Sequence, residues 1–243
     1  MTKRAFSSWL RRISFLAVAT ALLTGLQASA GDWVGYMNVY DNNAGSQGGL
    51  VFGQGWGVAD LKTTVTTSNP GTIIGDQLVL QPNFNTYTDN PGDPFWRDNA
   101  GAGPGGNKWM EANTFVETNP ITFPSYTLQG TVDANDLDTN LYTAEAFIKV
   151  LDPGAGFATI LNDRVTLPAS GSFELTSDLT QPDLQGKILQ AGFTMNGLNA
   201  NVVNEAAYGS VSVSVVPEPA SVGLAAVGLA GLAGMARLRR RRA

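Results

Sequence analysis

The chain has 243 residues, with 15 Lys and Arg against 20 Asp and Glu, a formal net charge of −5, and neither cysteine nor histidine. The absence of these two residue types excludes disulfides, zinc sites built from them, cysteine nucleophiles and Ser-His-Asp triads. Hydrolysis of a glycosidic bond needs only two carboxylates, but no pattern in the sequence singles out a pair. We therefore expect a protein that is not an enzyme and that needs no cofactor, apart from a possible Ca²⁺.

The N-terminal segment 1–30 has the three parts of a secretory signal peptide. Its basic residues are Lys3, Arg4, Arg11 and Arg12. An uncharged apolar run follows from 13 to 26, and Ala28-Ser29-Ala30 then supplies the small residues that signal peptidase needs. We expect export by the Sec route, with Gly31 as the first mature residue.

The segment 31–216 is strongly acidic. Once the four basic residues of the signal peptide, the five of the C-terminal tail and Glu218 are set aside, six Lys and Arg remain against 19 Asp and Glu, a formal charge of −13. Such a body repels polyanions, so we expect no binding to nucleic acid. Its length suffices for one domain with a sizeable core.

Short apolar stretches separated by Gly, Pro, Asn and Asp indicate strands, and helical periodicity is absent. The predicted strands are Trp33–Tyr40, Leu50–Phe52, Leu61–Thr67, Gln77–Gln81, Trp109–Glu117, Tyr126–Asp133, Tyr142–Leu151, Arg164–Leu167, Ser172–Thr176, Ile188–Met195 and Ser210–Val216. The last alternates valine with serine and closes the domain, whereas Tyr142–Leu151 has the pattern of a central strand. The fold class we expect is all-β, an antiparallel β-sandwich of jelly-roll type.

Two connections differ from the rest. The long stretch 83–107 is dense in Asn, Gly, Pro and Asp and predicts a loop. The second, 133–140, places Asp133, Asp136 and Asp138 at the spacing of oxygen ligands for Ca²⁺. It lacks the ligand and glycine that an EF-hand requires at its fifth and sixth positions, where Leu137 and Asp138 stand. A calcium site and a solvated turn both remain open.

The C-terminal half contains four strand-like segments: SYTLQGTV (125–132), AFIKVL (146–151), GSFELTSDL (171–179) and 189–215 with its final GSVSVSV. In this order they resemble the galactose-binding-like jelly roll of carbohydrate-binding modules. The resemblance implies a carbohydrate ligand. Sugars need an exposed aromatic ring and polar partners, and the predicted loop offers Tyr87, Asp93, Trp96 and Asp98 as candidate ligand-binding residues. The alternative is that Trp96 plugs the edge of the sandwich. We expect Trp33, Trp56 and Trp109 in the core.

The last 28 residues, 216–243, have an order of their own. Pro217-Glu218-Pro219 prevents a strand or helix from continuing, and 220–236 is then an uncharged run of 17 residues, which as a helix spans about 25 Å and is just long enough to cross a bilayer. The basic residues that follow are Arg237, Arg239, Arg240, Arg241 and Arg242. The positive-inside rule keeps them in the cytoplasm, so the body must lie outside.

This order resembles the PEP-CTERM sorting signal, also named the ice-binding protein C-terminal domain. The resemblance implies recognition by an exosortase, with cleavage near Pro217-Glu218-Pro219 and loss of the membrane helix; the alternative is an anchor that is never cut. Regularly repeated threonines for an ice face are absent, so the second name describes the tail alone.

We expect a non-enzymatic protein of the envelope or extracellular matrix, with exopolysaccharide as the candidate partner there. The alternatives are a carbohydrate-binding module with a defined glycan and a two-carboxylate glycan hydrolase.

Overall fold

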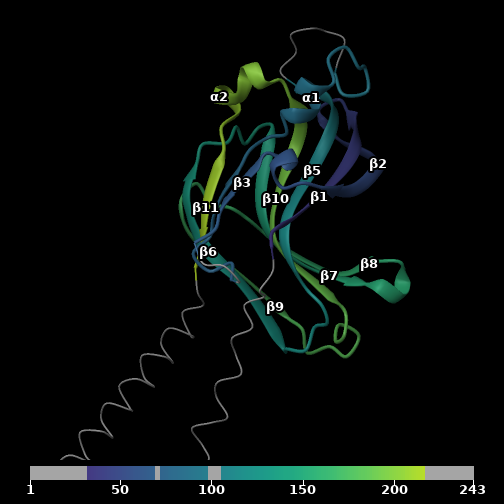
Figure 1. The fold of residues 1–243 in the computed structure, drawn as a ribbon, viewed down its shortest axis with the longest axis vertical. Helices are drawn as coiled ribbons and strands as arrows, with labels where there is room; N and C mark the ends of the chain where they lie inside the picture. The colour runs from purple at the N-terminus through teal and green to yellow at the C-terminus, as the bar shows by residue number, and fades with distance from the viewer. Residues whose placement is uncertain (1–31, 69–71, 98–104, 217–243) are drawn as a thin grey trace, which may run out of the picture. The chain divides into compact units, whose positions relative to one another are not determined.

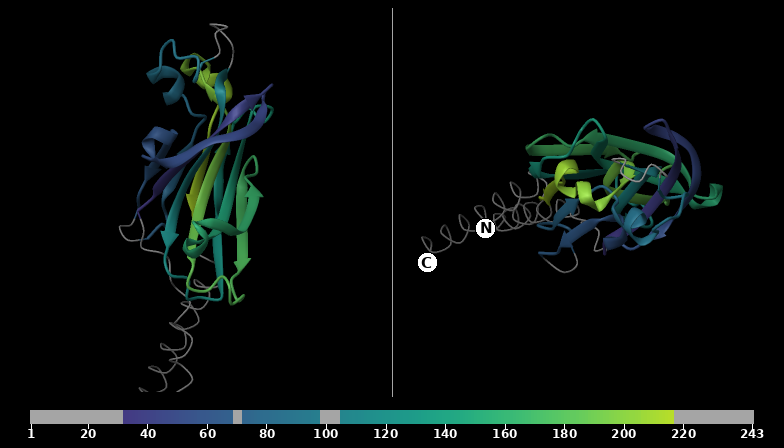
Figure 2. Two further views of the ribbon diagram at one scale, coloured as in Figure 1. Left: turned by 90° about the vertical axis from the view of Figure 1, so that its right-hand side faces the viewer. Right: turned by 90° about the horizontal axis from the view of Figure 1, so that it is seen from above.

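The computed structural model describes residues 32–68, 72–97 and 105–216. Over these residues the chain forms eleven β-strands, two short α-helices and three 3₁₀ turns. The strands pair antiparallel throughout and divide into two sheets that pack face to face (Figures 1 and 2). The all-β class and the antiparallel sandwich predicted from the sequence are confirmed.

The larger sheet has six strands in the order β2-β1-β5-β10-β7-β8. Their bounds are β1 (Val34–Asn43), β2 (Ser46–Trp56), β5 (Gly105–Thr118), β7 (Tyr142–Asp152), β8 (Ala158–Thr166) and β10 (Ile188–Ala200). The smaller sheet has five strands in the order β3-β4-β11-β6-β9. Their bounds are β3 (Thr63–Thr66), β4 (Gln77–Leu80), β6 (Ser125–Asn135), β9 (Gly171–Asp178) and β11 (Val211–Val215).

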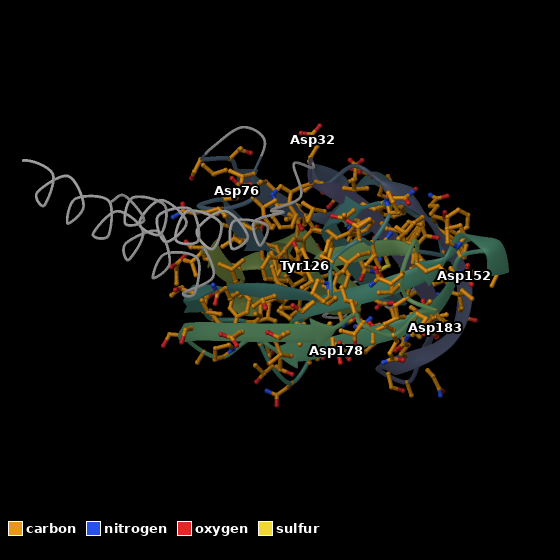
Figure 3. All side chains as sticks on the ribbon, turned by 90° about the horizontal axis from the view of Figure 1, so that it is seen from below. Asp32, Asp76, Tyr126, Asp152, Asp178 and Asp183 are labelled. Atoms are coloured by element: carbon orange, nitrogen blue, oxygen red, sulfur yellow. The ribbon has the colours of Figure 1, made fainter. Side chains whose placement is uncertain are left out.

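Side-chain alternation along the strands builds the core between the sheets. In β11 the three valines are buried and the two serines between them are half-exposed, because successive side chains point to opposite faces. In β7 and β10 most side chains on both faces are buried, as the sequence of β7 predicts for a central strand. Tyr126 of β6 lies between the sheets, whereas Asp32, Asp178 and Asp183 lie at the periphery (Figure 3).

Several strands run beyond their predicted bounds, and the structure adds helices that the sequence pattern does not predict. Strands β2 and β8 differ most from their predicted bounds. Pairing with β1 and β7 extends them through residues whose local pattern is weak, because β2 is rich in glycine and β8 is largely exposed. The predicted loop 83–107 contains helix α1 (Asn85–Asp89) and the first residues of β5, and helix α2 (Glu205–Tyr208) precedes β11. Both helices lie at the same end of the sandwich (Figure 1).

The described residues belong to one compact unit, Ser29–Glu218. Its core draws on both sheets and on α2, from Met37 in β1 to Val215 in β11. Because this core is assembled from residues of the unit itself, we expect the segment 31–216 to fold as a domain. No helix in the described part of the chain is long and apolar enough to cross a membrane; the predicted membrane helix 220–236 lies outside it.

Candidate functional site

The face of the six-stranded sheet that points away from the smaller sheet, called the outer face here, carries a groove of about 510 Å³. Alternation along β1 defines this face, since Met37 and Val39 point into the core and Asn38 and Tyr40 point away from it. Every lining side chain has a polar group, and all six strands contribute. The lining residues are Asn38, Tyr40, Gln47, Glu111, Glu145, Lys149, Thr159, Asn162, Arg164 and Asn196.

An ion-pair network crosses the groove. Arg164 of β8 donates from Nη2 to Glu111 Oε1 of β5 at 2.6 Å and from Nη1 to Glu145 Oε2 of β7 at 3.0 Å. Burial would raise the pKa of Glu111, but hydrogen bonds from Arg164 and Asn38 and the positive charges of Arg164 and Lys149 outweigh it, so its pKa is lowered. Glu111 is therefore ionised and fixed in place.

Two side chains of β1 complete the hydrogen bonding of Glu111. Asn38 Nδ2 donates to Oε2 at 2.9 Å, and the Tyr40 hydroxyl donates to the same oxygen at 3.0 Å. Burial and the neighbouring Glu111 carboxylate raise the pKa of Tyr40 to about 12, so its hydroxyl keeps its proton. The Glu111 carboxylate thus accepts hydrogen bonds from Arg164 on one side and from Asn38 and Tyr40 on the other. These bonds preorganise the geometry of the groove.

Lys149 forms the wall of the groove beside this network. Its ammonium lies 5.0 Å from the centre of the Phe147 ring, which is fully buried on the outer face. Burial lowers the pKa of Lys149, and the positive charge of Arg164 adds to this while the Glu111 carboxylate opposes it. Two acidic and two basic side chains therefore line the groove, which is close to neutral within a strongly acidic domain.

The outer face of the two central strands also carries buried polar side chains. Asn113 of β5 and Thr194 of β10 stand opposite each other in the register and are buried. Asn113 Oδ1 and Thr194 Oγ1 accept no hydrogen bond from the described part of the chain. Unpaired buried polar atoms are costly, so this face is not a second hydrophobic core.

The loop residues predicted to bind a ligand lie elsewhere. Tyr87 in α1 is only 5% exposed, and the guanidinium of Arg97 stacks 4.3 Å from its ring centre. Trp96 packs against the core and lies edge-on to Phe95, with ring centres 4.7 Å apart. The structure therefore does not present Tyr87 and Trp96 as an exposed aromatic face.

Trp96 instead belongs to an aromatic cluster beneath β2, which also contains Phe52, Trp56 and Phe95. This position corresponds to the edge-plugging alternative. Asp93 accepts a hydrogen bond from the backbone N–H of Phe95 at 2.9 Å, which fixes the turn before Trp96. Asp98 lies outside the described residues.

Sequence reasoning missed the residue that holds this loop. Asn199 of β10 is fully buried; its Nδ2 donates to Thr86 Oγ1 at 3.0 Å and to the Trp96 carbonyl at 2.8 Å. Its Oδ1 accepts from the Lys108 backbone N–H at 3.0 Å. Nothing in the local sequence NGLNANV distinguishes this asparagine from its neighbours, so only the tertiary structure identifies it.

One tryptophan prediction is wrong. Trp33 and Trp56 pack against the core as expected. Trp109 stands opposite Tyr40 and Leu198 in the register of β5, and alternation with the buried Met110 places it on the outer face, where it is half-exposed. The reason is alternation along β5: Trp109 lies on the same face as Glu111, Asn113 and Glu117, whereas Met110, Ala112 and Val116 point into the core.

The three candidate calcium ligands do not converge. Asp133 accepts from Ser214 Oγ at 2.7 Å, Asp136 from the Ser210 backbone N–H at 3.0 Å, and Asp138 from the Asn140 backbone N–H at 3.1 Å. Across the described ranges no three acidic side chains are close enough together to hold a metal ion. Each of the three carboxylates instead has its own hydrogen-bond partner, in Ser214, Ser210 and Asn140 respectively.

The predicted terminal signals lie outside the described residues. They comprise the cleavage site Ala28, Ala30 and Gly31, the motif Pro217, Glu218 and Pro219, and the basic residues Arg237, Arg239, Arg240, Arg241 and Arg242. Comparison with protein families tests the C-terminal one. Residues 215–242 match the PEP-CTERM protein-sorting motif. The predicted sorting signal is thereby confirmed, and with it an exported protein of the cell envelope or surface that exosortase sorts.

Two solved structures are distantly similar to the chain. One is described as "Structural basis for the promiscuous specificity of the carbohydrate-binding modules from the beta-sandwich super family", with a TM-score of 0.38, 11% identity, and coverage of 77% of this chain and 56% of that one. The other is described as "CBM4 structure and function", with a TM-score of 0.27, 13% identity, and coverage of 65% of this chain and 80% of that one. This chain thus spans little more than half of the first structure.

A search of curated proteins finds no match. Similarity at these levels transfers neither a ligand nor a residue, so the function is argued from the groove itself.

Proposed function

We propose that the exported domain is a non-catalytic module that binds carbohydrate in the groove of its outer face, and that the sorting motif delivers this module to the envelope or to extracellular polysaccharide. One observation carries the proposal: a preorganised groove with polar lining from all six strands of one sheet. An outer face without a function would be a solvated surface or an apolar interface, and this face is neither.

The chemistry of the lining suits a polyhydroxylated ligand. The carboxamides of Gln47, Asn162 and Asn196 each offer both donors and acceptors, and the Thr159 hydroxyl does the same. Sugar hydroxyls also donate and accept, so both partners can be satisfied at once. Glu111 and Arg164 already satisfy one another, which leaves these neutral groups to select the ligand.

An aromatic ring extends the groove along β1. Tyr36 is 38% exposed and shares the outer face of β1 with Asn38 and Tyr40. A Cβ atom on Gly53 would come within 2.8 Å of the Tyr36 hydroxyl oxygen and 3.2 Å of its Cε1. The hydroxyl end of the ring therefore lies over this glycine of β2, and the exposed part of the ring can supply the apolar contact that carbohydrate binding uses.

The same network supports the absence of catalysis. A two-carboxylate hydrolase needs one carboxyl group that keeps its proton, with a raised pKa. In this groove Glu111 and Glu145 share one guanidinium, and the pKa of Glu111 is lowered. Glu111 is therefore not arranged as a proton donor to a glycosidic oxygen.

The test uses the segment 31–216 in affinity electrophoresis through gels that contain polysaccharides of different composition. Tyr36→Ala and Asn196→Ala should weaken retardation by a binding gel about 3- to 10-fold each, the loss expected for one aromatic or hydrogen-bonding contact. The matched control is Phe157→Ala, which removes a ring that is 61% exposed at the β7–β8 turn and not part of the groove lining.

Binding that survives both groove substitutions would place the ligand elsewhere, and no retardation by any polysaccharide would refute the proposal. Assays for released reducing sugar on the same polysaccharides test whether the domain is non-catalytic, since any release would show an enzyme.

A further inference from the structure

Each sheet has two edge strands, and three of these four edges carry a feature that discourages pairing with another chain. Strand β3 has only four residues. Strand β9 carries Glu174 and Asp178, and β8 carries Asp163 and Arg164. Short edges and charged edges are two of the devices by which soluble proteins avoid adding a strand.

The remaining edge, β2, lacks both devices. Its eleven residues, SQGGLVFGQGW, include no charged residue and no proline. Within the described residues β2 pairs only with β1, and it is exposed along most of its length, at the rim of the sheet (Figure 1). A charge-free stretch of this length stands out in a domain with a formal charge of −13. A contact made through β2 would therefore place no like charges of two copies against each other.

The register against β1 shows which part of β2 is able to pair. Toward Ser46 the register shifts twice, and such bulges twist an edge away from a straight partner. From Phe52 to Trp56 the register is regular, with each residue opposite one residue of β1. Gly53 and Gly55 alternate with Gln54 there, so β2 itself places no side chain on the outer face over this stretch.

We infer that β2 is a homotypic edge, at which two copies of this chain join antiparallel through Phe52–Trp56 and continue their six-stranded sheets into one. Gln54 is the middle residue of this stretch, so it stands opposite Gln54 of the second copy. The two-fold axis of such a pair is perpendicular to the sheet, and both outer faces therefore point the same way. The sorting motif delivers all copies to one surface, which raises their local concentration and favours a weak contact.

A single introduced cysteine tests the contact directly, because the natural chain has none. Opposite residues of antiparallel strands have Cα atoms about 4.5–5.5 Å apart, within the range that a disulfide spans. In Gln54→Cys of the segment 31–216, oxidised glutathione accepts the two electrons and two protons as the two thiols join across the axis. The matched control is Ile160→Cys on β8, the opposite edge of the same sheet, where the side chain is 39% exposed.

We expect several-fold more covalent dimer from Gln54→Cys than from Ile160→Cys at equal concentration. Equal yields would overturn the inference, because they would report random collision. Sedimentation velocity provides a measurement without oxidation: the weight-average mass of the unmodified segment should rise with concentration up to about 1 mM, the effective concentration that tethering provides. Gln54→Lys should abolish this rise by placing two charges at the axis, and Ile160→Lys should not. The inference is also overturned if the unmodified segment stays monomeric at every concentration. The same holds if the mass of Gln54→Lys rises with concentration as much as that of the unmodified segment.

Discussion

Replacing Arg164 with methionine removes the guanidinium charge that holds the groove together and keeps an unbranched, though shorter, apolar side chain. Arg164 contacts Glu111 at 2.6 Å and Glu145 at 3.0 Å, and the exposed fractions of these side chains are 25%, 10% and 24%. Removing one partner of a fully buried pair costs about 3–5 kcal/mol. Because Arg164 and Glu145 are partly solvated, we expect a smaller loss, of about 2–3 kcal/mol in the free energy of unfolding at neutral pH.

The loss should depend on pH with a definite sign. In the native domain the pKa of Glu111 is lowered although burial opposes this, so its contribution to stability is present above the unfolded-state pKa and is lost as pH falls through the folded-state pKa. In Arg164→Met the main source of lowering is gone and burial remains, so Glu111 destabilises the fold at neutral pH and less so once it is protonated. The gap between the two proteins should therefore narrow in acid.

Urea denaturation of the segment 31–216 at about pH 7 and about pH 4 measures this gap. In thermal unfolding at neutral pH, the melting temperature of Arg164→Met should lie about 5–10 °C below that of the natural sequence, given about 2–4 °C per kcal/mol for a domain of this size. The double variant Glu111→Gln with Arg164→Met removes both charges and should recover most of the loss. An equal gap at both pH values, or a double variant no more stable than the single one, would refute the electrostatic explanation.

Three further outcomes follow from the same structure. Trp96→Ala should lower the free energy of unfolding by about 2–4 kcal/mol through lost packing with Phe52 and Phe95, and should leave polysaccharide affinity unchanged when measured well below the melting temperature. Asn199→Ala should cost about 2–3 kcal/mol, because it removes three buried hydrogen bonds, and protease should then cleave the loop 83–97 faster. Mass spectrometry of the exported protein should find a C-terminus near Pro217 to Pro219; an intact chain through Arg242 would contradict removal of the tail.

Local sequence was sufficient for most of the fold. The alternation of Val211, Val213 and Val215 with serines placed β11 correctly, because one buried face and one solvated face leave a two-residue period in the sequence. The strands predicted poorly are the two edges of the large sheet. Strand β2 is rich in glycine and β8 is largely exposed, so their extended structure comes from pairing with a neighbour and leaves a weak pattern.

The groove could not have been predicted from the sequence. Glu111, Arg164 and Asn38 are far apart along the chain, and a lone charged residue in a strand is usually a solvated one. Their convergence depends on the strand order, which places β1 beside β5 and brings β8 across from it. The loop 83–97 misled the prediction for the same reason: Tyr87 and Trp96 have the composition of a binding loop, but Asn199, about a hundred residues later, fixes that loop against the sandwich.

The sequence by itself determined the destination of this protein and its fold class, because a sorting signal acts as a linear motif and strand alternation is local. Which polar side chains share a surface, and which aromatic rings are buried, was decided only by the tertiary structure. Those properties depend on the pairing of distant strands, whose register and order are set by how two apolar faces pack together.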